Sequence, residues 1–182
     1  MRMTITNVRL AFPAIFAPQA FGEGEPAYSA KFIVDPKDPQ VQKIRDAIAA
    51  VAKEKWGEKA SSILALLTEQ KKVAWVEGPY RNSNGDAYDG FEGKFTLSTR
   101  SASTRPSALN RDKTPVTQND GVIYPGCYVD AAVEFYAQDN KWGRRINCGI
   151  RGVRFVGPGD SFGGGSAAST DEFSDLADED FV

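Results

Sequence analysis

The chain has 182 residues, with 22 basic and 24 acidic side chains, two cysteines and no histidine. Without histidine there is no Ser-His-Asp or Cys-His pair and no imidazole ligand, and two cysteines are too few for an ordinary structural zinc site. An enzyme built from this sequence would depend on paired carboxylates or on Mg²⁺ held by carboxylates. We therefore expect a non-enzymatic protein with no cofactor, no metal and no catalytic residue.

The acidic and basic residues are distributed unevenly along the chain. Residues 157–182 contain seven Asp or Glu and no Lys or Arg, so residues 1–156 carry 22 basic and 17 acidic residues, a net charge of +5. A basic body joined to an acidic tail favours a polyanion as partner, with the tail as an internal competitor for the same surface. A solubilising tail on an ordinary domain is the alternative.

The length suits one domain with a single hydrophobic core. We expect this domain at residues 1–156, a flexible Gly/Ser-rich linker at 157–170 and an acidic tail at 171–182. With no secretion signal, Cys127 and Cys148 are expected to be reduced core thiols of a cytoplasmic protein. No uncharged apolar run approaches the ~20 residues of a membrane helix, so we expect no membrane partner.

Two strands are expected near the N-terminus. Residues 4–12 alternate well enough for a strand, which Pro13 and Pro18 should end, and residues 28–34 form the second strand. One side of the first strand should hold Thr4, Thr6, Val8, Leu10 and Phe12.

Two helices should follow these strands. Asp38 is placed as an N-cap with Pro39 at the first helical position, and Trp56-Gly57 marks the end. Residues 58–67 predict a shorter second helix. The buried face of the first helix should consist of Val41, Ile44, Ile48 and Val51.

The second half of the chain has the pattern of β-structure. We expect a short strand at 73–76, a polar loop at 80–90, an alternating strand at 91–100 and a long irregular segment at 101–124. On the strand at 91–100, Phe91, Gly93, Phe95 and Leu97 should face inward, and Glu92, Lys94, Thr96, Ser98 and Arg100 should face solvent.

A hairpin should close the domain, with strands at 128–138 and 144–156. Its inward residues should be Val129, Ala131, Val133, Phe135, Ile146, Cys148 and Ile150. Its outward residues should be Tyr128, Asp130, Glu134, Tyr136, Arg145, Asn147 and Arg151. Together these elements predict an α+β, mainly β fold, namely a Greek-key barrel like the oligonucleotide-binding (OB) fold with a helical insertion.

A protein that binds single-stranded nucleic acid needs cations for the phosphates and aromatic faces for the bases. The β half interleaves both kinds of residue in its loops and on its outward strand faces. The candidate DNA-binding residues are Tyr80, Arg81, Tyr88, Lys94, Arg100, Arg105, Arg111, Lys113, Tyr124, Trp142, Arg144, Arg145 and Arg151.

Several of these aromatic positions also have a purely structural interpretation. The parity of Phe91 matches the core side of its strand, so it is expected in the core. Tyr80 and Tyr88 flank a polar loop, where a ring is as suited to hold the loop as to stack a base. Trp142 lies in a turn and should be exposed.

A Mg²⁺-dependent nuclease is the main alternative function. Asp86 and Asp89 share the polar loop, although such residues commonly make turn hydrogen bonds. Asp130 and Glu134 lie roughly 13 Å apart along an extended strand, too far apart to share one metal. A structural or assembly protein is a third class, which predicts tight homo-oligomers and no preference for nucleic acid.

Four segments resemble a family of bacteriophage single-stranded DNA-binding proteins, long catalogued only as a domain of unknown function. The segments are Asn7–Pro13, Lys31–Asp35, Tyr124–Asp130 and Gly149–Phe155. The resemblance spans nearly the whole chain. It implies an OB-fold barrel that coats single-stranded DNA during phage replication or recombination. Self-association is compatible with this role.

The resemblance also implies that the acidic tail recruits replication or recombination proteins. Tails of this kind combine acidic residues with a terminal aromatic that docks in a basic pocket with an apolar floor. Here the tail-docking residues are Asp178, Glu179, Asp180 and Phe181. Val182 is a departure, because it moves the terminal carboxylate off the phenylalanine and so leaves the identity of the partner pocket open.

Overall fold

The structure is a computed structural model, and it describes residues 1–20 and 22–162. Most of the expected linker and the whole acidic tail lie outside the described residues. The docking residues of that tail, Asp178, Glu179, Asp180 and Phe181, are therefore also outside the part of the chain described below. None of the described helices is both long and apolar enough to cross a membrane.

Seven strands form one sheet in the order β3-β4-β2-β1-β6-β7-β5. Neighbouring strands are antiparallel, except that β5 runs parallel to β7. The strands are β1 Arg2–Gln19, β2 Ala27–Val34, β3 Trp75–Val76, β4 Phe95–Ser101, β5 Ser107–Leu109, β6 Tyr128–Asn140 and β7 Gly143–Gly157.

Residues just before β3 close this sheet into a barrel. Val73 forms a parallel bridge with Ile146 of β7, and the Ala74 N–H donates to the Ile146 carbonyl at 2.8 Å. On the other side, the Ser98 N–H of β4 donates to the Ala74 carbonyl at 2.9 Å. Strands β4 and β7 are therefore joined through one short segment, and the expected barrel with a helical insertion is confirmed.

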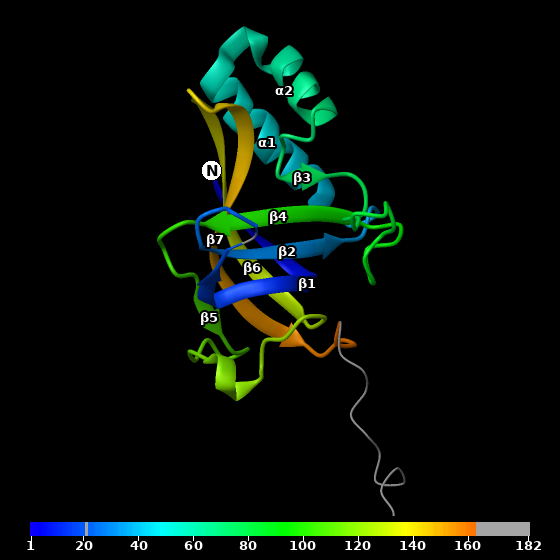
Figure 1. The fold of residues 1–182 in the computed structure, drawn as a ribbon, viewed down its shortest axis with the longest axis vertical. Coiled ribbons are helices and arrows are strands. Elements are labelled where there is room, and N and C mark those ends of the chain that lie inside the picture. The colour runs from blue at the N-terminus through cyan, green and yellow to red at the C-terminus, as the bar shows by residue number, and fades with distance from the viewer. Residues whose placement is uncertain (21, 163–182) are drawn as a thin grey trace, which may run out of the picture.

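The helical insertion lies between β2 and β3 and covers one end of the barrel (Figure 1). It consists of α1 Gln40–Trp56, a 3₁₀ turn Gly57–Lys59 and α2 Ala60–Glu69. Asp38 caps α1, because its Oδ1 accepts the Gln40 N–H at 2.9 Å. All four predicted apolar residues of α1 are buried, which confirms the face read from their spacing.

Strand β1 differs from the prediction in length and in its faces. It continues through Pro13 and Pro18 to Gln19, so the prolines do not end it. Asn7 and Phe12 adopt left-handed φ values of 52° and 48°, and the pairing register shifts at both places. These bulges break the period-2 alternation. Consequently the five residues expected on one side do not share one environment: Val8 and Leu10 are buried, whereas Thr4, Thr6 and Phe12 are exposed.

The predicted strand at 91–100 begins only at Phe95 and ends at Ser101. Phe91 is buried as expected, but it lies before the strand in a small cluster with Ala11 and Ile33. Thr96 is buried rather than solvent-facing, because its hydroxyl donates to the Gly78 carbonyl at 2.9 Å.

Strands β6 and β7 form the predicted hairpin, whose far end rises beside the helices in Figure 1. The inward residues from both strands are all buried. Asp130 is an exception on the outward face. It is buried because its carboxylate accepts the Asn7 N–H at 2.9 Å and pairs with Arg154 at 2.5 Å.

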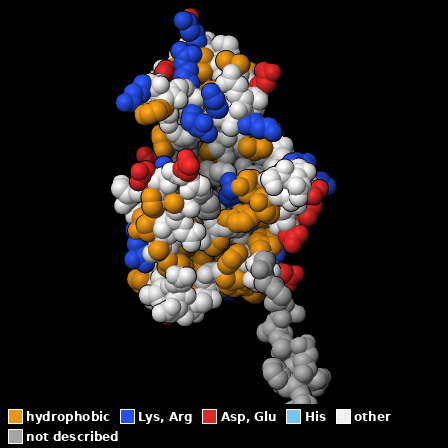
Figure 2. Space-filling model, viewed as in Figure 1, with side chains coloured by type: hydrophobic (Ala, Val, Ile, Leu, Met, Phe, Trp, Pro, Cys, Tyr) orange, Lys and Arg blue, Asp and Glu red, His pale blue; other side chains and the backbone are white. Residues whose placement is uncertain are grey.

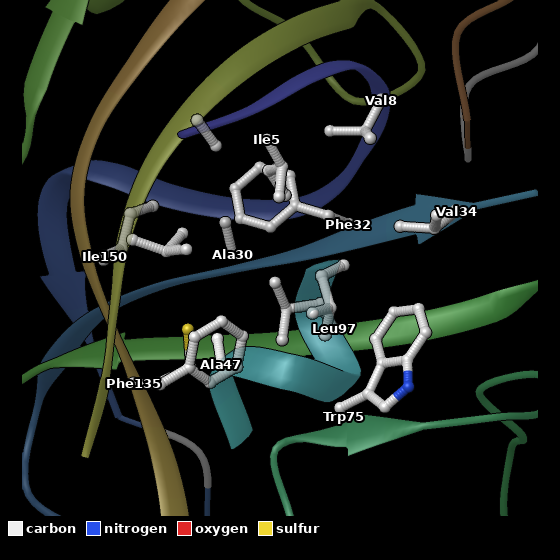
Figure 3. Close-up of a cluster of buried hydrophobic side chains, with 14 of the residues drawn as sticks. Ile5, Val8, Ala30, Phe32, Val34, Ala47, Trp75, Leu97, Phe135 and Ile150 are labelled. Atoms are coloured by element: carbon white, nitrogen blue, oxygen red, sulfur yellow. The ribbon is translucent and has the colours of Figure 1, made fainter. Parts of the chain in front are cut away.

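The core lies inside the barrel, where side chains from several strands meet the inner face of α1 (Figure 3). Ile5, Phe32 and Ile150 point toward one another there, and Phe135 lies next to Ala47 of α1. Cys127 and Cys148 are both free and buried, as predicted. Burial raises the pKa of both thiols, which makes them unreactive packing groups.

Candidate nucleic-acid interface

A groove of about 850 Å³ crosses the barrel between β2 and β4 on one side and the β6–β7 hairpin on the other. Four candidate DNA-binding residues line it, namely Tyr80, Tyr88, Arg100 and Arg145. The groove also contains the seam at Val73 and Ala74 where the barrel closes. Figure 2 shows hydrophobic side chains gathered over the barrel strands and basic side chains gathered over the helical part.

The aromatic wall of the groove comes from two loop tyrosines and one bulged strand residue. The rings of Tyr80 and Tyr88 are stacked, with centroids 4.9 Å apart and planes at 16°. Phe12 meets both edge-on, with centroids at 5.7 Å and 5.1 Å. The backbone holds the loop in the same place, since the Tyr88 N–H donates to the Tyr80 carbonyl at 2.9 Å. The tyrosines thus hold the loop and place two stacked aromatic rings in the lining of the groove.

Lys31 of β2 lies against this wall. Its ammonium is 4.1 Å from the centroid of the Tyr80 ring and donates to Ser98 Oγ at 2.7 Å. Burial lowers the pKa of Lys31 from its ordinary value. A cation beside an aromatic ring suits a nucleotide, whose base can stack while its phosphate meets the ammonium.

The other groove cations are Lys71, Arg100 and Arg145. No ion pair joins any of the four groove cations to a carboxylate of the described residues. No Asp or Glu is among the described residues that line the groove either. The groove is therefore a basic surface whose charge is left for an external anion.

Four other candidate cations have partners within the protein. Arg81 donates to the Gly85 carbonyl at 2.9 Å and so holds the polar loop. Three arginine or lysine residues pair with carboxylates: Lys94 with Asp35 at 2.9 Å, Arg144 with Asp139 at 3.3 Å and Arg151 with Glu134 at 3.2 Å. None of these four lines the groove.

The remaining five candidates are also outside the groove. Arg105, Arg111 and Lys113 are exposed in the segment that follows β4. Tyr124 is half-buried, and its hydroxyl bonds with the backbone of Gly159 at 3.0 Å and 3.1 Å. Trp142 is exposed over 79% of its surface, as predicted, at the tip of the β6–β7 hairpin.

The carboxylates do not form the metal site that a nuclease would need. In the part of the chain that the structure describes, no three acidic or cysteine side chains come together in a way that could hold a metal ion. The turn at 82–86 is built by Asn82, whose Oδ1 accepts the N–H groups of Asn84 and Asp86, and not by the carboxylates of Asp86 and Asp89.

Sequence patterns missed four aromatic or basic residues that line the groove: Phe12, Lys31, Lys71 and Tyr136. Lys31 had a usable signal, because it is a lone lysine between Ala30 and Phe32 in an otherwise apolar strand. Tyr136 was recognised as outward-facing but not as part of a site. Phe12 carried no signal, because its orientation depends on a bulge.

Comparisons with known proteins show the family of this chain. The family model described as "Enterobacter phage Enc34, ssDNA-binding protein" matches residues 1–182. The chain belongs to this family. The family is one of single-stranded DNA-binding proteins, so the expectation of a phage-type binding protein rather than an enzyme is confirmed.

Individual relatives extend the comparison. Protein p50 of Acyrthosiphon pisum secondary endosymbiont phage 1 is 38% identical over 97% of this chain and 95% of the relative. The single-stranded DNA-binding protein of bacteriophage Enc34, solved in complex with single-stranded DNA, is 27% identical over 89% of both chains with a TM-score of 0.72. The T7 single-stranded DNA-binding protein gp2.5 is 12% identical with a TM-score of 0.58, which shows the fold alone.

Proposed function

We propose that the groove binds single-stranded DNA without sequence preference, by neutralising phosphates and stacking bases. The observation that carries this proposal is the groove itself, where stacked Tyr80 and Tyr88 adjoin unpaired cations and no carboxylate of the described residues intervenes. Stacking on aromatic rings tolerates any base, because every base has a π-face. The complex of the Enc34 relative with single-stranded DNA supports the same ligand.

The biological setting is DNA replication or recombination of a phage, in the cytoplasm of its host. Both processes expose single strands that need a protein coat. The acidic residues 171–182 compete with DNA for the basic groove and, once displaced, dock partner proteins of these processes through Asp178, Glu179, Asp180 and Phe181. The charge division between residues 1–156 and 157–182 supports this competition.

Gel shifts on single-stranded and duplex DNA of equal length test the binding. The intact protein should retain single strands at salt concentrations where it releases duplex. Tyr80→Ala should weaken single-strand binding about tenfold, because one stacking face is lost. Tyr124→Phe is the matched control, since that ring lies outside the groove. Equal loss in both variants would place the DNA elsewhere.

Deleting residues 171–182 tests the competition separately. Affinity for single-stranded DNA should rise, most strongly at low salt, because the tail acts through charge. A variant with the same length and with Asn and Gln in place of Asp and Glu should behave like the deletion. An affinity that stays unchanged or falls in both proteins would remove the tail from the binding equilibrium.

A further inference from the structure

A second cavity of about 420 Å³ lies beside the groove. Phe12 and Tyr88 line both cavities, so they form the partition between them. The walls of the second cavity are largely apolar and include Ala87, Phe91 and Phe162. Its volume suits one flat, planar group, and its position continues the path that we propose for DNA.

Phe12 lies between the two cavities and has an unusual backbone conformation. Its φ of 48° is a left-handed value that a non-glycine residue with a bulky side chain rarely adopts. The ring nevertheless remains 42% exposed while making edge contacts with Tyr80 and Tyr88. Such strain persists where the surrounding structure imposes it, and it is common at ligand-binding sites. The bulge therefore holds the Phe12 side chain between the two adjoining cavities.

Two polar side chains lie at the lining of the second cavity. Asn82 uses its Oδ1 to accept two backbone N–H groups, which leaves its amide NH₂ as a donor. Asp89 is exposed and supplies an acceptor. An apolar cavity with one donor and one acceptor at its lining matches the faces and edge of a nucleobase.

We propose that this cavity is a subsite for a single nucleobase, that Phe12 separates this base from its neighbour in the groove, and that Asp89 favours bases with an exocyclic amino group over thymine. The exocyclic amino group of cytosine, adenine or guanine can donate to the Asp89 carboxylate, whereas the only donor on the thymine base edge is its ring N3–H. This inference rests on the proposed function and adds one position at which base identity matters.

The base preference is tested with oligo(dC) and oligo(dT) of equal length, by fluorescence anisotropy at neutral pH. Asp89→Ala should lower the preference for oligo(dC) relative to oligo(dT) by about fivefold, the effect of one hydrogen bond. Removal of a negative charge strengthens both complexes alike, so the ratio of the two dissociation constants is the informative quantity. Asp86→Ala, in the same loop but outside the cavity, is the matched control and should leave the ratio unchanged.

Occupancy of the cavity is tested by filling it. Ala87→Leu should weaken binding of both oligonucleotides about tenfold, because one stacked base is excluded, while circular dichroism remains that of the wild type. An unchanged affinity in Ala87→Leu together with an unchanged ratio in Asp89→Ala would overturn the subsite. If Tyr80→Ala still weakens binding in that case, the proposed function stands. If it does not, the groove is not the DNA-binding site.

Discussion

The groove and the outer face of β6 and β7 use similar residues for different purposes. On the outer face, Arg2 and Arg151 both contact Glu134 at 3.2 Å, and Arg154 pairs with Asp130. In the groove, the four cations have no carboxylate partner among the described residues. Both surfaces are rich in basic side chains, but only the groove leaves that charge for a polyanion. The pairing of the basic side chains, rather than their number, therefore distinguishes the groove from the outer face of β6 and β7.

The strongest test of this difference removes an acid from the outer face. Asp130→Ala leaves the Asn7 N–H and Arg154 without their buried acceptor, and it should lower the free energy of unfolding by about 3 kcal/mol. Urea denaturation measures this loss. Arg144→Ala breaks an exposed ion pair with Asp139 and should cost less than about 1 kcal/mol. Equal losses would mean that the outer face has no special structural role.

Two lysines provide a matched pair for binding. Lys31→Gln removes the ammonium beside Tyr80 and should weaken single-strand binding about fivefold, since one cation and its cation–π contact are lost. Lys94→Gln removes a lysine that is already paired with Asp35, and it should change binding less than about twofold. Titration of a labelled oligonucleotide with each variant compares them. A larger loss of affinity in Lys94→Gln than in Lys31→Gln would show that DNA binds near Lys94 and not in the groove.

The salt dependence of binding separates groove arginines from paired arginines. Arg145→Ala and Arg100→Ala should each reduce the slope of log K against log salt by about 0.7, because each removes one phosphate contact. Arg151→Ala should leave the slope unchanged, since Arg151 is paired with Glu134. A reduced slope in Arg151→Ala would show that the outer face also contacts DNA.

The smallest effect concerns acid stability. Hydrogen bonds from Arg151 and then Arg2 lower the pKa of Glu134 below its ordinary value of 4.5. A carboxylate with a depressed pKa stabilises the fold above its ordinary pKa, and this stability is lost as the pH falls through the lowered value. Glu134→Gln should therefore melt slightly below the wild type at neutral pH, and the difference should disappear well below pH 4.5. A difference in melting temperature that stays constant with pH would indicate packing instead of charge.

Local periodicity was sufficient for the helices and the hairpin. All the apolar residues that the spacing of α1 and the alternation in β6 predicted to be buried are buried, because both faces are set by regular backbone geometry. The loop tyrosines Tyr80 and Tyr88 were also found, because a turn flanked by aromatics is a local signal.

Contacts between distant parts of the chain could not be predicted in the same way. The bulges at Asn7 and Phe12 depend on pairing between β1 and its neighbours, and they reverse the faces expected from alternation. Whether an arginine is free depends on a carboxylate on another strand, as the pairing of Arg154 with Asp130 illustrates. The sequence therefore predicted the types of residue at the interface. Strand pairing and ion pairs between distant residues determine which of the candidate residues lie in the groove.

The chain is anchored to the barrel just after β7. The Phe162 N–H donates to the Pro125 carbonyl at 3.0 Å, and Arg9 donates to the Asp160 carbonyl at 2.7 Å while its guanidinium lies 4.1 Å from the centroid of the Phe162 ring. The last described residue, Phe162, is thus held at the wall of the second cavity. In the competition that we propose, the effective concentration of the acidic residues 171–182 at the groove is set by the length of chain that follows Phe162 and not by the amount of protein. Diluting the protein cannot relieve competition of this kind, whereas added salt or a longer DNA strand can.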